Sequence, residues 1–207
     1  MPRCDKNNFK SPQAYLIKVR LDRVDKIRCK WAESHELFIP YHDLEWGVPV
    51  HDDRLLFEML NLEGAQAGLS WLTILKKREN YRKAFDNFNT KKIIKYTSAK
   101  KASLLKNTGI VRNRLKINAV VENAKKIIEV QKEFGSFDAY IWKFVEGKPL
   151  ARAKRKNAIL VSELMCKELK QRGFKFVGAT ICYAFMQAVG MVNEHSPNCF
   201  RAKVVFK

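Results

Sequence analysis

The stretch Ser98–Lys132, which reads SAKKASLLKNTGIVRNRLKINAVVENAKKIIEVQK, is the part of the sequence that indicates the fold most directly. It predicts a short helix, a tight turn at Asn107–Ile110 and a long second helix that opens with basic residues. Gly109 supplies the permissive backbone of such a turn, and amides at the start of the second helix, with Arg112 and Arg114 beside them, could bind a phosphate. The stretch suits a helix-hairpin-helix, although an ordinary helical corner with a solvated charged face explains it equally well.

The rest of the folded part is predicted to be helical almost throughout. One helix begins at Asp52 or Asp53, either of which can cap it ahead of a run of apolar residues, and a second helix follows Ser70. Because no series of strands and no internal repeat is visible, the sequence predicts an all-α fold of packed helices with short connections. Further amphipathic stretches cover 90–96, 98–107, 112–133, 136–146, 162–172 and 178–192.

A large positive charge favours a polyanionic partner. The 207 residues include 40 Lys and Arg against 21 Asp and Glu, a formal net charge of +19, and nucleic acid is the first partner that such an excess suggests. A generally basic protein would show the same charge. Hydrophobic residues make up 46% of the chain, which is too apolar for a disordered protein. One basic run is expected either in a loop on a DNA-facing surface or simply in solvent: Arg152, Lys154, Arg155 and Lys156.

The cysteines and the apolar runs bear on where the protein works. Five cysteines, an odd number, and the lack of a recognisable export signal predict a reducing, cytoplasmic compartment. The longest apolar run, 178–192, is interrupted by Gln187 and Gly190 and is shorter than the ~20 residues that span a bilayer. We therefore expect a buried helix there and no membrane partner.

Residues 1–28 differ in composition from the rest of the chain. They carry eight Lys or Arg against three Asp and show little periodic apolar pattern. They are predicted to form a flexible basic extension, followed by one folded domain over 29–200 and a short tail over 201–207. The extension could add DNA affinity through phosphate contacts, or it could be dispensable.

Cysteine and histidine form two pairs that could together hold a metal ion: Cys29 with His42, and His195 with Cys199. Thiolate and imidazole ligands suit Zn²⁺, and a spacing of four lets His195 and Cys199 point at one ion. Four protein ligands leave no open position, so the ion would be structural and would join the two ends of the domain. Such pairs also arise by chance, and the spacing alone is weak support.

Aromatic residues gather around carboxylates in the segment 31–71. Glu45 and Glu63 are interleaved with them. Such a group could form a cage that stacks on a flat or cationic ligand while a carboxylate binds its edge. A core rich in aromatic residues is the alternative, and composition alone favours it. The aromatic residues expected to form this group are Trp31, Phe38, Tyr41, Trp46 and Trp71.

Several strings together closely resemble the 3-methyladenine DNA glycosylase I family. The resemblance runs from about residue 28 to residue 199. The chain departs from the family in residues 1–28 and in the stretch from about Pro149 to Ser162, which is shorter and more basic. The strings are RCKW at 28–31, YHDLEWGVP at 41–49, LEGAQAGLSW at 62–71, KKRENYR at 76–82, GIVRNR at 109–114, RGFKFVG at 172–178, TICY at 180–183 and NEH at 193–195.

The resemblance implies the helix-hairpin-helix DNA glycosylase fold, with a zinc site that joins the N- and C-terminal segments. Glu63 matches the carboxylate that reads the excised base. Tyr41, Trp46 and Trp71 match the aromatic surround of that base, with Trp31 and Phe38 nearby. The four zinc ligand positions are matched by Cys29, His42, His195 and Cys199.

The activity that the resemblance implies is base-excision repair. A monomer would flip 3-methyladenine out of alkylated double-stranded DNA and hydrolyse its glycosidic bond, leaving an abasic site without cutting the strand. It would work in a bacterial-type cytoplasm, at the nucleoid. Two alternatives are a non-catalytic, zinc-stabilised DNA-binding module and a glycosylase of shifted alkyl-base specificity.

Overall fold

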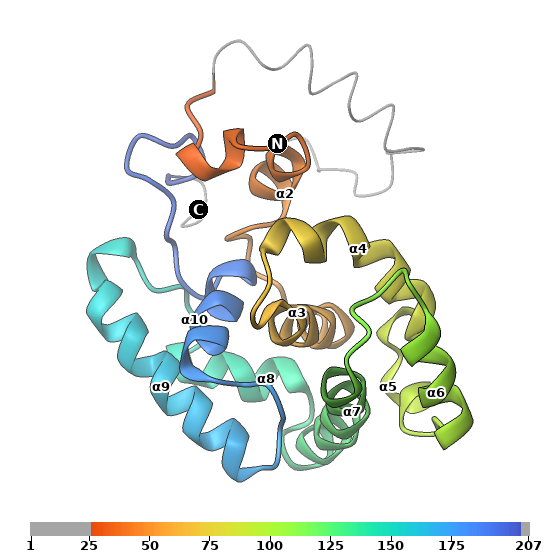
Figure 1. Ribbon diagram of the computed structural model, residues 1–207. Coiled ribbons are helices and arrows are strands. Elements are labelled where there is room, and N and C mark those ends of the chain that lie inside the picture. The colour runs from red at the N-terminus through yellow and green to blue at the C-terminus, as the bar shows by residue number, and fades with distance from the viewer. Residues whose placement is uncertain (1–25, 204–207) are drawn as a thin grey trace, which may run out of the picture.

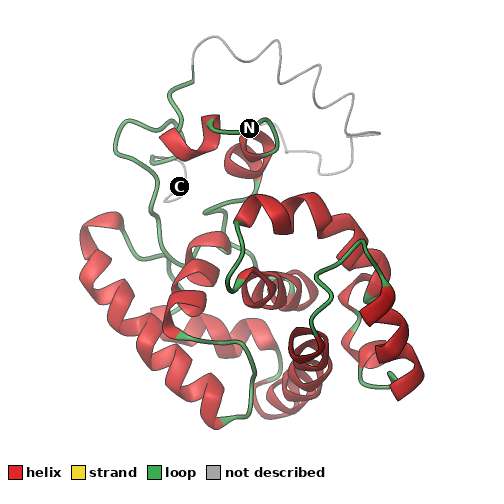
Figure 2. Cartoon of the chain, in the orientation of Figure 1, coloured by secondary structure: helices red, strands yellow, loops and turns green. Residues whose placement is uncertain are grey.

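The computed structural model describes residues 26–203, and all of its regular elements are helices (Figure 2). Within that range the only β pairing is an isolated bridge between Leu150 and Val192, so the predicted all-α class is confirmed. Most of the predicted basic extension lies outside the described residues. The helices are η1 (Lys30–Glu33), α2 (Phe38–Leu44), α3 (Asp53–Gln66), α4 (Trp71–Ala84), η2 (Asp86–Phe88), α5 (Thr90–Ile93), α6 (Ser98–Lys106), α7 (Arg114–Phe134), α8 (Phe137–Trp142), η3 (Lys143–Val145), η4 (Arg152–Lys154), α9 (Arg155–Gln171) and α10 (Ala179–Ala188).

Side-chain caps fix where the helices around the centre begin. The Asp52 carboxylate accepts a hydrogen bond from the Leu55 amide at 2.8 Å, which identifies Asp52 as the cap of α3. Ser70 caps α4 in the same way, as expected. Asn113 caps α7, so the long helix begins two residues later than the predicted 112.

Helix α3 is the centre of the molecule and is buried along most of its length. It packs against α4, α7, α8 and α10, and α10 packs in turn against α9 (Figure 1). Apolar side chains on all sides of α3, including Leu56, Phe57 and Leu60, are fully buried by these neighbours. The helix therefore holds its polar residues in an enclosed setting.

The predicted start of α9 at residue 162 is wrong, because the helix already begins at Arg155. Ala158, Ser162, Met165 and Leu169 form a buried stripe at helical spacing that begins before the predicted boundary. The basic run at 152–156 is therefore η4 and the first turn of α9, and not a loop.

The predicted helix over 178–192 is also too long, because α10 ends at Ala188. Gly190 has φ +74°, and a Cβ placed there would lie 2.4 Å from the carbonyl carbon of Val48. Only glycine permits this close approach. The apolar residues that follow Ala188 are buried in a connecting segment, and their pattern alone resembles a continued helix.

The two ends of the described chain lie side by side (Figure 1). The Phe200 amide donates to the Ile27 carbonyl at 2.9 Å. Arg28, the last residue of the predicted extension, is buried and pairs with Asp43 at 2.8 Å. No helix within residues 26–203 is long and apolar enough to cross a membrane.

Candidate functional site

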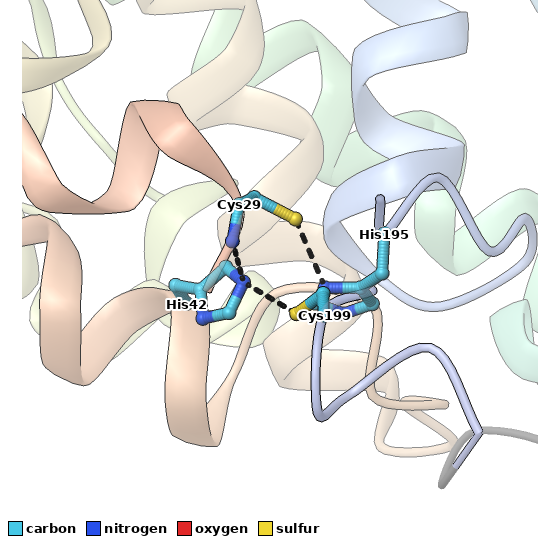
Figure 3. A group of neighbouring side chains, drawn as sticks. All are labelled: Cys29, His42, His195 and Cys199. Atoms are coloured by element: carbon cyan, nitrogen blue, oxygen red, sulfur yellow. Dashed lines mark hydrogen bonds between the residues drawn. The ribbon is translucent and has the colours of Figure 1, made fainter. Parts of the chain in front are cut away.

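The two Cys–His pairs of the sequence meet in one buried cluster (Figure 3). The ligand atoms of Cys29, His42, His195 and Cys199 all lie within 4.8 Å of one another. His42 Nε2 is 3.4 Å from Cys199 Sγ, and His195 Nδ1 is 3.6 Å from both sulfur atoms. Two sulfur and two nitrogen donors facing a common centre can hold a metal ion.

Neighbouring groups orient these four donors. The Asp43 carboxylate lies 2.8 Å from His42 Nδ1, and the Trp46 carbonyl lies 3.2 Å from His195 Nε2, so each imidazole turns its other nitrogen to the centre. The Ser196 amide donates to Cys29 Sγ at 3.2 Å, which suits a thiolate. Such outer partners are typical of metal-ligating histidines and cysteines.

A cavity of about 560 Å³ lies beside this cluster. All six residues predicted for the base pocket line it, whereas Glu45 pairs with Arg78 at 2.5 Å on another side. The cavity is thus lined by η1, α2, the ends of α3 and α10, the starts of α4 and α9, η4 and the segment after α10. The predicted residues in its wall are Trp31, Phe38, Tyr41, Trp46, Glu63 and Trp71.

The aromatic side chains in the wall form one connected group. Trp31 makes edge contacts with Phe38 and Trp46, at centroid distances of 5.7 and 5.0 Å, and Tyr41 lies 5.3 Å from Trp71. The Trp71 Nε1 atom is buried and has no hydrogen-bond partner among the described residues. The wall can therefore stack on a planar ligand and keeps one donor without a partner.

Glu63 is an enclosed carboxyl group without a countercharge. It is 5% exposed, and it makes no hydrogen bond or ion pair with any residue in the described range. Burial raises its pKa from 4.5 to about 8. By contrast, Glu58 on the same helix is paired with Arg78 and Arg82, each at 2.7 Å; burial raises its pKa, but the two guanidinium groups outweigh this and lower it.

Two of the aromatic residues join the cavity to the Cys–His cluster. Trp31 lies 5.4 Å from the His42 ring, and Trp46 lies 4.6 Å from the His195 ring, between ring centroids. Gly47 has φ +75°, and a Cβ there would lie 2.8 Å from His195 Nε2, so glycine is needed where the backbone passes the cluster. The cluster thus fixes the position of one wall of the cavity.

The turn between α6 and α7 is anchored to the same region. Lys116 Nζ donates to the carbonyls of Ala65 and Ala67, at 2.8 and 2.6 Å, and Lys77 Nζ donates to the Thr108 carbonyl. The Lys116 bonds fix the start of α7 to the end of α3 and the residue after it, and the Lys77 bond fixes the turn to α4.

The structure changes the expected part of Gly109 in phosphate binding. Its amide donates to the Asn107 side chain at 2.8 Å and is already used. Arg112, Arg114 and Leu115 are exposed, and the amides of Arg114 and Leu115 make no hydrogen bond to another residue within 26–203. Gly109 therefore shapes the turn, whereas the amides that could bind a ligand are those of Arg114 and Leu115 at the start of α7.

Sequence reasoning missed several residues that line the cavity. Arg152 and Arg155 were placed only in a basic run, and nothing in their spacing indicated a neighbour in space. Glu194 was noticed only as part of a family string. Its carboxylate accepts a hydrogen bond from the Tyr183 hydroxyl at 2.7 Å. The missed residues are Gln66, Arg152, Arg155, Ala184, Gln187, Glu194 and Ser196.

Known proteins are similar to this chain in sequence and in fold. The family model "Methyladenine glycosylase" matches residues 31–202. The DNA-3-methyladenine glycosylase of Haemophilus influenzae is 45% identical over 177 residues, which cover 83% of this chain and 96% of that protein. A crystal structure of 3-methyladenine DNA glycosylase I is 48% identical with a TM-score of 0.79, over 84% of this chain and 98% of that one. A variant of 3-methyladenine DNA glycosylase I, solved in complex with 3-methyladenine, is 34% identical with a TM-score of 0.79, over 84% and 96% of the two chains.

Proposed function

The chain belongs to the methyladenine glycosylase family, and from that membership we propose that its cavity binds 3-methyladenine flipped out of alkylated DNA and releases it by hydrolysis. The observation that carries this function is Glu63, a buried carboxyl group with no hydrogen-bond or ion-pair partner among residues 26–203, in an aromatic cavity of about 560 Å³. That volume lies within the ordinary range of small-ligand sites.

The chemistry of the substrate fits these residues. Methylation at N3 places a positive charge on the adenine and weakens its glycosidic bond, so little acid catalysis is needed. The faces of Tyr41, Trp46 and Trp71 hold a cationic ring by stacking and cation–π attraction. A damaged base is also easier to extract from the stack than a well-paired one.

Glu63 recognises the base and stabilises its positive charge. Its carboxylate accepts a hydrogen bond from the exocyclic amine, and a cation beside it lowers the pKa that burial has raised. The empty site holds the group largely protonated at neutral pH, and binding of the cationic base ionises it. The cavity therefore distinguishes the cationic base from uncharged bases by charge as well as by shape.

Water completes the reaction at the sugar carbon as the bond to the base breaks. Among the described residues that line the cavity, none is a lysine, so the wall supplies no amine to form an imine with the sugar. The product is an abasic site in an uncut strand. Glu63 is given the roles of recognition and electrostatic help rather than that of a general base.

The Cys–His cluster is proposed to hold one structural Zn²⁺. The ligand set of two thiolates and two imidazoles is the one that tetrahedral zinc favours, and the oriented histidines support it. Four ligands leave no position for substrate, so the ion would hold the ends of the chain and the tryptophan wall in place. Metal analysis should find one zinc per chain; protein purified with no metal and an unchanged melting temperature would contradict this role.

The DNA is proposed to be double-stranded and bound by a monomer. The exposed start of α7, with Arg112 and Arg114, would contact the phosphate backbone beside the cavity. The excess of positive charge would strengthen this contact and make it sensitive to salt. The search for damage would then take place along the chromosome.

Identification of the released base tests the function. Methylated duplex DNA is incubated with the protein, and free bases and strand breaks are measured separately. Release of 3-methyladenine with uncut strands is the expected result. Binding without release would favour the non-catalytic module, and release of another alkylated base in its place would favour a shifted specificity.

A further inference from the structure

One edge of the cavity carries a concentrated positive charge that the proposed chemistry of the base does not use. The sequence from 147 to 162 holds five Lys or Arg and no Asp or Glu. Four of them lie within η4 and the first turn of α9, and two of these, Arg152 and Arg155, line the cavity. We call this group the basic rim; it consists of Arg152, Lys154, Arg155 and Lys156.

The basic rim is held in place by the protein. Arg152 Nη1 donates to the carbonyls of Glu194 and His195, each at 2.9 Å, which fixes η4 to the segment that carries a Cys–His ligand. Arg155 Nε lies 3.7 Å from the Glu194 carboxylate, and its side chain is 59% exposed. A guanidinium group has five N–H donors, so these contacts leave each arginine with further donors for a ligand.

The charge of the rim suits an anion better than the base. Glu194 is the only carboxylate among the described residues that forms an ion pair with this group, so four cations face one anion. A positively charged methylpurine gains nothing from arginine at the edge of its pocket. A phosphate gains from the charge and also from the paired donors of a guanidinium group.

The position of the rim is complementary to that of the α6–α7 turn. Figure 1 shows the first turn of α9 and the α6–α7 turn on opposite sides of the α3–α10 pair. A nucleotide flipped into the cavity is joined to the DNA strand by phosphates on both of its sides. Since the rim borders the cavity on the side away from the turn, it is placed to meet a phosphate that the turn does not meet.

We propose that the basic rim binds a phosphate of the damaged strand next to the flipped nucleotide, with Arg155 as the main contact. This rests on the proposed function, since a flipped nucleotide defines the strand. Phosphate contacts on both sides would hold the distorted backbone in the flipped state without reading sequence.

The salt dependence of DNA binding tests the rim. The probe is a duplex with a tetrahydrofuran abasic analogue, and its affinity is measured against salt for the intact chain and for Arg155→Gln, Lys156→Gln and the double variant. Each lost phosphate contact should reduce the slope of log K against log salt by about 0.9. Arg155→Lys, which keeps the charge, should keep most of the slope. Lys167→Gln is the matched control, because Lys167 is exposed farther along α9.

Each outcome decides a separate claim. A slope that stays the same in the double variant overturns the rim, provided that the variant keeps the melting temperature of the intact chain. A slope that falls equally in Lys167→Gln would show that the loss of any positive charge has this effect, and it would also overturn the proposal. Weaker binding of free 3-methyladenine to Arg155→Gln, with an unchanged slope, would assign Arg155 to the base. If the intact chain releases no base from methylated DNA, the proposed function fails. The salt dependence of binding to the abasic duplex still tests the phosphate contact of the rim separately.

Discussion

The substitution Glu63→Gln should make the protein more stable, and increasingly so as the pH rises. The carboxyl group has a pKa of about 8 in the folded chain, against 4.5 when it is solvated. Below pH 4.5 both states are protonated and the group makes no difference. As the pH rises toward 8 the unfolded state ionises first, so wild-type stability falls relative to that of the uncharged variant.

The size of the effect follows from the shift. A difference of about 3.5 pKa units at about 1.4 kcal/mol per unit amounts to about 5 kcal/mol above pH 8 and about 3 kcal/mol at pH 7. The free energy of unfolding, measured with urea at several pH values, should therefore separate the two proteins by about 1.4 kcal/mol per pH unit between pH 5 and pH 7.5.

The matched control is Glu163→Gln on the exposed side of α9, which should follow the wild type at every pH. A difference between Glu63→Gln and wild type that stays flat with pH would refute the reasoning. It would mean that the carboxylate is already ionised and compensated in the folded protein. The assignment of Glu63 as an uncompensated reader of a cationic base would then lose its physical basis.

Three further predictions concern catalysis, the metal and the turn. Below pH 8, kcat/KM for excision should rise with pH as Glu63 ionises in the free enzyme. If kcat/KM of Glu63→Gln rises with pH in the same way, the rise does not come from Glu63. Asp43→Ala removes the carboxylate that orients His42 and should weaken zinc affinity by about 10–100-fold in a chelator competition; wild-type affinity would contradict the ligand assignment. Lys116→Met removes two hydrogen bonds to the loop after α3 and should lower the free energy of unfolding by about 1–3 kcal/mol, whereas Lys106→Met, at an exposed position, should not.

Much of the fold could be predicted because local chemistry sets the helix boundaries. Asp52, Ser70 and Asn113 accept hydrogen bonds from amides in the first turns of their helices, and this preference is readable in sequence. The end of α10 could not be found in this way. The residues after Ala188 are as apolar as those before it, and the end of the helix becomes clear from the left-handed φ of Gly190 and its close approach to Val48.

The candidate site was predictable where residues form motifs and not where they meet through the fold. The aromatic residues and Glu63 were recognised from strings, and the structure brings all of them to one cavity. Arg152 and Arg155 come from a basic run with no motif of its own, and packing against the segment with Glu194 places them there. The amides of the α6–α7 turn are a similar case, because the hydrogen bond from the Gly109 amide to the Asn107 side chain depends on the turn geometry.

The most direct test of the account is single-turnover excision of 3-methyladenine by the intact chain and by Glu63→Gln on the same methylated duplex at pH 7. The account predicts rapid release by the intact chain and a loss of at least about tenfold in the variant, equivalent to about 1.4 kcal/mol of transition-state stabilisation, although the variant is the more stable protein. Equal rates in the two proteins would contradict it, because the cavity would then release the base without the carboxyl group that defines it.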